Sequence, residues 1–95
     1  MSGAILIADE RIRQVEKGFD AVNDDKNSCG EMAACAHLIM TDVVRERGNV
    51  GRTWAMERAR HVREKYGTDY ITRLTIAGAL IAAEIDRLLR KGPAA

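Results

Sequence analysis

The chain has 95 residues and a formal net charge of +1; 46% of its residues are hydrophobic and 31% are charged. This length fits a single domain, residues 1–95, and this composition excludes a disordered chain. The small net charge excludes a global field that would attract nucleic acid. The run Ala4–Ala8 is too short for a signal-peptide core or a membrane span, and two cysteines suit a reducing compartment. The sequence therefore predicts a protein of the cytoplasm.

Four segments carry apolar residues at helical spacing, which predicts an all-α, compact four-helix domain. The first helix is expected over residues 5–17 and ends before Gly18, with Phe19 folding back onto its last turn. Its core side is predicted to carry Ile5, Ala8, Ile12 and Val15. Residues 20–27 have turn chemistry and no apolar period, so they are predicted to form a loop.

The second helix is expected to begin at Ser28, because Ser28 and Glu31 match a capping box, and to end at Gly48. The third is expected over residues 53–66, and the fourth runs from its cap at Asp69 to about Lys91. The predicted inner residues of the second and third helices are Met32, Ala36, Ile39, Val43, Ala55, Ala59, Val62 and Tyr66.

The fourth helix is a long apolar C-terminal helix. Its predicted seam contains Leu74, Ala77, Ile81, Ile85 and Leu88, and Ile76, Leu80 and Ala83 widen it. Three short partner helices are too few to cover this circumference, and a large exposed apolar patch is a liability in a soluble monomer. The sequence therefore predicts a homodimer or higher homo-oligomer; the alternative is the central helix of a monomer.

Polar residues are concentrated in the segment 20–27. Its side chains Asp24, Asp25 and Asn27 are candidates for contacts with the base or ribose of a nucleotide. Grouped carboxylates also suit Mg²⁺ or Ca²⁺, but the spacing does not match a calcium-binding EF-hand loop, so no metal site is predicted. The alternative is a solvated turn that caps the following helix.

Basic residues are concentrated between Arg45 and Lys65, where seven cations face three anions. Arg52, Arg58, Arg60 and Lys65 are candidates for phosphate contacts, since guanidinium groups bind phosphate in a bidentate manner. Trp54 or Phe19 would stack on a base. The alternative is an ordinary surface helix, in which Arg60 and Glu64 form an i,i+4 pair.

No catalytic constellation is readable. His37 and His61 have no metal-ligand spacing, and a Cys–His pair requires the fold to bring Cys29 or Cys35 to His61. A Mg²⁺-dependent nucleotide hydrolase would draw on Glu10, Glu31, Asp42, Glu84 and Asp86, yet no helix carries a Glu-x-x-Glu or Glu-x-x-Asp pair. The sequence thus predicts no enzyme, no cofactor and no metal.

Both ends of the chain resemble a family of small, mostly uncharacterised phage and prophage proteins. The resemblance rests on Glu10-Arg-Ile-Arg-Gln14, Gly18-Phe19, Asp24-Asp25, Gly30-Glu-Met-Ala-Ala34 and the segment from Ala77 to Leu88. Residues 40 to 70 are not covered. The family has a tryptophan where this chain has Phe19 and histidines where it has Asn23 and Asn27, so any metal site built on those histidines is absent here. The spacing of Gly18-Phe19 and Asp24-Asp25-Lys26 also resembles a ryanodine-receptor-type repeat.

The resemblance implies a phage accessory protein that counters host immunity in the host cell cytoplasm. In one mechanism it sequesters a nucleotide immune signal. In the alternative it binds a host defence protein, as anti-CRISPR proteins do. The combination of an arginine-rich segment with an Asp/Asn segment favours the nucleotide, and an enzyme ranks third.

Overall fold

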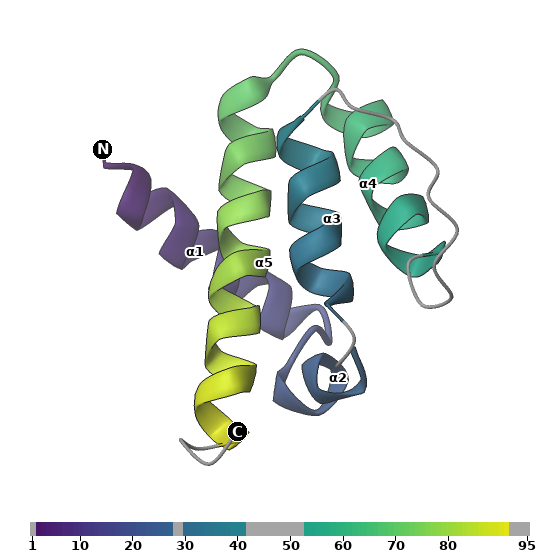
Figure 1. The fold of residues 1–95 in the computed structure, drawn as a ribbon. Coiled ribbons are helices and arrows are strands. Elements are labelled where there is room, and N and C mark those ends of the chain that lie inside the picture. Colours follow the sequence, from purple (N-terminus) through teal and green to yellow (C-terminus); the bar gives the residue numbers. More distant parts are fainter. Residues whose placement is uncertain (1, 28–29, 42–52, 92–95) are drawn as a thin grey trace.

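The computed structural model describes residues 2–27, 30–41 and 53–91, and these residues form five helices with no strand among them. The helices are α1 (Gly3–Glu16), α2 (Ala21–Lys26), α3 (Glu31–Met40), α4 (Thr53–Tyr66) and α5 (Tyr70–Lys91) (Figure 1). The all-α prediction is confirmed. The predicted number of four helices is wrong, because the segment expected to be a loop contains α2.

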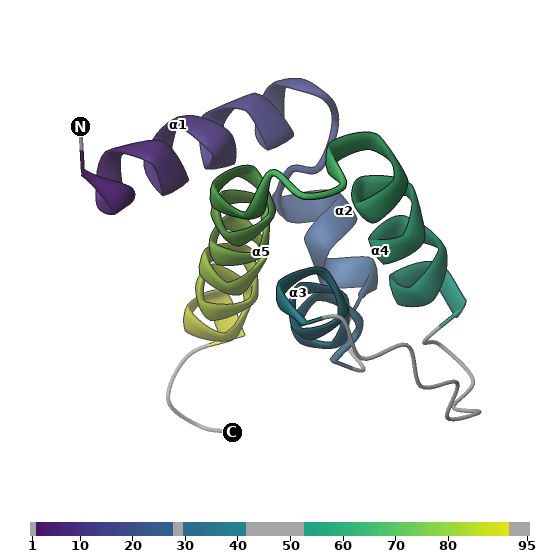
Figure 2. The same ribbon diagram turned by 90° about the horizontal axis from the view of Figure 1, so that it is seen from above.

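Three helices enclose the core. In Figures 1 and 2, α5, α3 and α4 lie side by side in that order, and α1 crosses α5. The core cluster comprises Cys35, Ala36, Ile39, Ala55, Ala59, Val62, Ile76, Ala77 and Leu80. Most of these side chains are small, so the three helices approach closely, and the predicted inner faces of α3 and α4 are confirmed where the structure describes them.

The prediction for α1 is wrong in its orientation. Ile5, Ile12 and Val15, which were expected in the core, are 53%, 58% and 43% exposed. The side chain that α1 buries is Gln14, whose amide donates to Glu10 at 3.1 Å. The side of α1 that faces the rest of the molecule therefore combines Gln14 with Ile7, which lies against Gly78 of α5, and it leaves Ile5, Ile12 and Val15 outside.

The helix ends follow local sequence signals. Gly18 adopts a left-handed conformation with φ 102°, and the amide of Phe19 donates to the carbonyl of Gln14 at 2.9 Å, which is a Schellman turn. Asp69 accepts from the amide of Thr72 at 3.2 Å and so caps α5, as predicted. By contrast, α3 ends at Met40 because Thr41 is extended, earlier than the predicted Gly48. The Ser28 end of the proposed capping box and residues 42–52 lie outside the described residues.

The outer face of α5 is less covered than expected. Of its predicted seam only Ala77 is buried, whereas the wider set of Ile76, Leu80 and Ala83 lies in the interior. Leu74, Ile81, Ile85 and Leu88 are 39% to 51% exposed. Within the described residues, no helix combines the length and the apolar character needed to cross a membrane.

Candidate functional site

One face of α4 carries Trp54, Arg58, His61 and Lys65, which follow one another at intervals of four, three and four residues. This spacing aligns side chains along a helix. Trp54 and Arg58 are half-buried, and His61 and Lys65 are exposed. These four residues are called the α4 stripe below. The adjacent face of α4 packs into the core, so the stripe lies at the edge of the core.

The turn between α1 and α2 brings an aromatic ring to the α4 stripe. The guanidinium carbon of Arg58 lies 5.0 Å from the centre of the Phe19 ring, a cation–π geometry. The Schellman turn at Gly18 positions Phe19, and Arg11 donates to its carbonyl oxygen at 3.1 Å. The fold thus brings together three residues predicted from sequence, namely Phe19, Trp54 and Arg58, although Trp54 also packs partly against the core.

The cations of α4 have no acidic partner among residues 2–27, 30–41 and 53–91. Across the described part of the chain, no carboxylate lies within ion-pair distance of Arg58, Arg60, Arg63 or Lys65. The pair of Arg60 with Glu64, which belonged to the alternative of an ordinary surface helix, is therefore not formed. Lys65 instead lies over the ring of Tyr66, at 5.4 Å. The helix consequently presents an excess of positive charge, four cations against the two carboxylates of Glu57 and Glu64.

Arg60 is separated from the other candidates. It lies on the opposite side of α4 from the stripe, on the side that also carries Glu57 and Glu64, and it is exposed. Arg60 therefore does not share the α4 stripe with Arg58 and Lys65, and its contact with phosphate stays a prediction. Arg52, the remaining phosphate candidate, lies outside the described residues.

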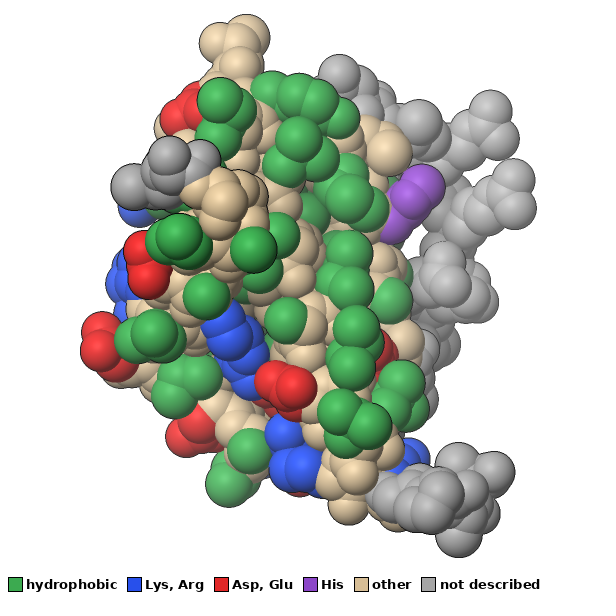
Figure 3. Space-filling model, turned by 90° about the vertical axis from the view of Figure 1, so that its left-hand side faces the viewer, with side chains coloured by type: hydrophobic (Ala, Val, Ile, Leu, Met, Phe, Trp, Pro, Cys, Tyr) green, Lys and Arg blue, Asp and Glu red, His purple; other side chains and the backbone are tan. Residues whose placement is uncertain are grey.

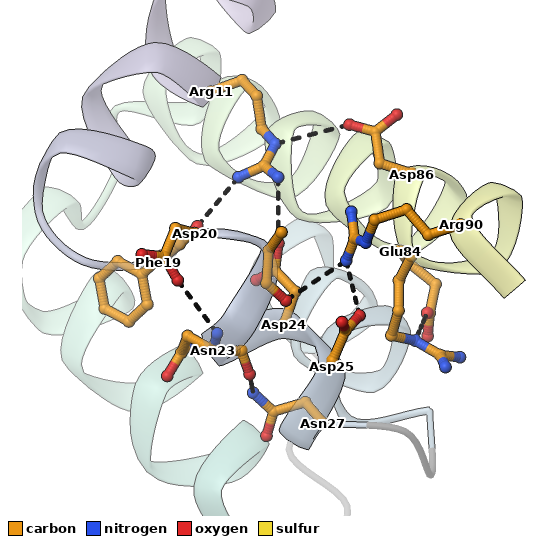
Figure 4. A network of polar contacts seen from close by, with 12 residues as sticks. Arg11, Phe19, Asp20, Asn23, Asp24, Asp25, Asn27, Glu84, Asp86 and Arg90 are labelled. Atoms are coloured by element: carbon orange, nitrogen blue, oxygen red, sulfur yellow. Dashed lines mark hydrogen bonds and ion pairs between the residues drawn. The ribbon is translucent and has the colours of Figure 1, made fainter.

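The acidic candidates are bound to arginines of the same chain, as Figure 4 shows. Asp24 is 2% exposed and its carboxylate accepts from Arg11 of α1 at 3.0 Å. Burial raises the pKa of the Asp24 carboxyl above its ordinary value, and the Arg11 charge counteracts this rise. Asp25 accepts from Arg90 of α5 at 2.7 Å. These ion pairs hold α2 against α1 and α5.

Asn27 is also engaged within its own segment, since its side-chain amide donates to the carbonyl of Asn23 at 3.3 Å. Asp20 accepts from the amide of Asn23 at 3.1 Å and caps α2. The polar atoms in this segment therefore have roles in the fold, and contacts of Asp24, Asp25 or Asn27 with a ligand stay a prediction.

Groups suited to catalysis are dispersed in the described residues. The thiol of Cys35 is completely buried, and burial raises its pKa to about 12, which leaves almost no thiolate at neutral pH. His37 and His61 are both exposed. No three His, Cys, Asp or Glu side chains within the described ranges are grouped so that they could hold a metal ion.

Two buried arginines of α5 were missed by sequence reasoning. Arg73 is 6% exposed and donates to the carbonyls of Ile39 at 3.1 Å and Gly67 at 3.3 Å. Arg87 is 5% exposed and donates to Glu84. The only sequence signal is their position on the same side of the helix as Ile76, Leu80 and Ala83, where a charged residue is unexpected. Comparison with protein-family models, curated proteins and solved structures finds no match to this chain.

Proposed function

We propose that the protein binds and sequesters a nucleotide-type ligand on the surface formed by Phe19 and the α4 stripe. The observation that carries this proposal is the position of Arg58, held 5.0 Å from the Phe19 ring with no carboxylate partner among the described residues. Such an arginine keeps its planar donors for phosphate oxygens, and the Phe19 contact limits its rotamers. Lys65 lies two turns along the same face and adds a second cation.

The distribution of ion pairs supports this site. Asp24, Asp25, Glu10 and Glu84 are neutralised by arginines of α1 and α5. The described residues of α4 carry the cations Arg58, Arg60, Arg63 and Lys65 against the anions Glu57 and Glu64. A positive potential therefore remains at α4, and this potential attracts a polyanion. In the setting that the resemblance implies, the ligand is a nucleotide immune signal of the host.

The alternative is a protein that inhibits a host defence complex by direct contact. The observation that favours it is the exposure of Ile5 and Ile12 on α1 and of several apolar side chains on α5. A Mg²⁺-dependent hydrolase ranks third, because Glu10 and Glu84, two of the carboxylates that it would use, are bound to Arg13 and Arg87.

A binding experiment tests the proposal directly. Isothermal titration against cyclic di- and trinucleotides, ADP-ribose and NAD is expected to give saturable binding for at least one of them. Arg58→Glu and, separately, Lys65→Glu are expected to weaken it at least tenfold, since a charge-assisted hydrogen bond contributes about 1.5 to 3 kcal/mol. Lys65 is exposed, so Lys65→Glu tests the site even if Arg58→Glu disturbs packing.

Arg60→Glu is the matched control. It changes the charge of α4 by the same amount on the opposite side of the helix, and it should leave affinity within about twofold of the wild type at physiological salt, where charges are screened beyond roughly 8 Å. If Arg60→Glu lowered the affinity as much as Arg58→Glu does, the ligand would be attracted by the general charge of α4 and would not bind at the proposed site. Absence of binding by all of these nucleotides would favour the protein-binding alternative. Mass spectrometry of the ligand released by denaturation separates sequestration from hydrolysis. Sequestration returns the ligand intact, whereas hydrolysis returns a cleaved product.

A further inference from the structure

Arg11 joins α1 to α2 and α5 through one guanidinium group. Its Nη1 atom donates to the carbonyl oxygen of Phe19 at 3.1 Å, and its Nη2 atom donates to Oδ2 of Asp24 at 3.0 Å. Its Nε atom lies 3.9 Å from a carboxylate oxygen of Asp86 on α5. Figure 4 shows the guanidinium between these groups. Because the donors of a guanidinium have fixed directions in one plane, the position of each contact constrains the other two.

Burial strengthens the pair of Arg11 with Asp24. Asp24 is 2% exposed, and the side chain of Arg11 is 17% exposed. Water screens such a pair only weakly, so the charge-assisted hydrogen bond restricts Arg11 to the rotamer that meets Asp24. In that rotamer Nη1 points to the carbonyl oxygen of Phe19. The carboxylate of Asp24 therefore determines, through Arg11, where the backbone of Phe19 is held.

Phe19 is held at both ends of its backbone. Its amide donates to the carbonyl of Gln14 at 2.9 Å, and its carbonyl accepts from Arg11. With the backbone fixed in this way, the ring lies against Arg58 of α4, whose guanidinium carbon is 5.0 Å from the ring centre. A continuous series of contacts thus leads from Asp24 on α2, through Arg11 and Phe19, to the α4 stripe.

Charged side chains of opposite sign lie next to one another in Figure 3, between the hydrophobic ones of the face on which α1 lies. Such charges can hold a helix in place without any role at a ligand site, so a comparison within α2 is needed. Asp25 provides it, because it binds Arg90 of α5 at 2.7 Å. Loss of the Asp25 charge loosens α2 from α5, whereas loss of the Asp24 charge acts on Arg11 and the Phe19 carbonyl.

We infer that Arg11 and Asp24 are positioning residues for the ligand surface formed by Phe19 and the α4 stripe. Neither side chain needs to touch the ligand. By fixing the backbone of Phe19 they place its ring against Arg58 before a ligand arrives, so less rotamer freedom is lost when the guanidinium binds a phosphate. The inference rests on the proposed function for the role of this surface, whereas the coupling of Asp24 to Arg58 can be measured without a ligand.

Nuclear magnetic resonance of the ligand-free protein tests the coupling. Protons above the face of an aromatic ring resonate upfield, so the Hδ protons of Arg58 are expected to be shifted upfield in the wild type. Phe19→Leu removes the ring and defines the unshifted value. Asp24→Asn is expected to reduce the shift, because a neutral amide binds Arg11 more weakly than a carboxylate does. Arg11→Lys is expected to reduce it as well, since one ammonium group does not reproduce the planar donors of arginine.

Asp25→Asn is the matched control. It makes the same change of charge at the neighbouring position of α2, and it should keep the upfield shift of Arg58. Circular dichroism is expected to show that all of these variants are folded at the temperature of the measurement. A wild-type shift of Arg58 in both Asp24→Asn and Arg11→Lys, or an equal loss of the shift in Asp25→Asn, would overturn the inference.

A titration with inorganic pyrophosphate, followed through the Nε–Hε signal of Arg58, connects the coupling to affinity. Asp24→Asn is expected to weaken binding by about threefold to tenfold, the loss expected when one immobilised side chain regains its rotamer freedom. Attraction by net charge alone predicts the opposite, because Asp24→Asn makes the protein more positive. Asp25→Asn shares that change of charge and should bind at least as tightly as the wild type.

The two failures can be told apart. Tighter binding of pyrophosphate by Asp24→Asn and Asp25→Asn alike would overturn the inference. A wild type that binds no pyrophosphate would contradict the proposed function, and the shifts of Arg58 in the ligand-free variants would still decide whether Arg11 and Asp24 position Phe19.

Discussion

Single side chains in the acidic and basic segments have roles that their sequence neighbours do not reveal. The aromatic and basic character of Phe19, Trp54 and Arg58 could be recognised from the sequence, and the fold brings them together. The ion pairs of Asp24 with Arg11 and of Asp25 with Arg90 join residues 13 and 65 positions apart. No local pattern specifies such distant partners. The sequence could therefore identify these carboxylates as candidates for contacts, but not the arginines with which they form ion pairs.

The buried thiol of Cys35 gives a prediction at the scale of one residue. Because burial raises its pKa to about 12 and leaves none of its surface accessible, Cys35 should not react with iodoacetamide in the native protein at pH 8. Peptide mapping by mass spectrometry is expected to find Cys35 unmodified before denaturation and modified after it in guanidinium. Rapid labelling of the native protein would show that α3 opens readily and would reopen the question of thiol chemistry.

At the scale of elements, helix ends were more predictable than helix faces. Gly18 and Asp69 act through bonds within a few residues, so their sequence signals suffice. The short helix α2 escaped prediction because it has no apolar period and its only signal is the cap at Asp20. The orientation of α1 depends on a tertiary contact: Arg11 points inward to meet Asp24, and this turns Ile5 and Ile12 outward.

The contact between α1 and α5 can be tested at Gly78. A Cβ there would lie 2.6 and 2.9 Å from Cδ1 and Cγ1 of Ile7. Gly78→Ala should therefore destabilise the protein by about 1 kcal/mol, because overpacking outweighs the gain in helix propensity. In an Ile7→Ala background the same change should stabilise it by about 1 kcal/mol. Urea denaturation is measured in an Ile81→Asp background, so that self-association through α5 does not contribute to the free energy of unfolding. Identical effects in both backgrounds would mean that α1 does not pack as described.

At the scale of the whole molecule, Arg73 joins parts that the apolar core alone does not connect. Its guanidinium binds the end of α3 through the carbonyl of Ile39 and the turn after α4 through the carbonyl of Gly67. The apolar pattern of α3 and α4 was sufficient to predict their core faces, whereas most of the predicted seam of α5 is exposed. A buried arginine that fastens three helices is invisible to periodicity, since its partners are backbone carbonyls.

Arg73→Met should accordingly lower the free energy of unfolding by about 2 to 3 kcal/mol, because apolar packing is largely kept while hydrogen bonds to buried carbonyls are lost. Arg90→Met is the control. Its pair with Asp25 is solvated, with both side chains at least 36% exposed, so Arg90→Met should destabilise the protein clearly less than Arg73→Met does. Chemical denaturation of both variants gives the comparison, and similar losses would show that Arg73 does not fasten the helices.

The contacts of the first two helices have a consequence for synthesis on the ribosome. Both α1 and α2 make their main contacts with α5, the last of the five described helices, and Arg90 reaches the carbonyl of Ala21 across 69 positions. Because translation proceeds from the N-terminus, α1 and α2 emerge well before the surface that receives them. They complete their packing only after α5 has left the exit tunnel, so a chain terminated before α5 cannot dock its own N-terminus.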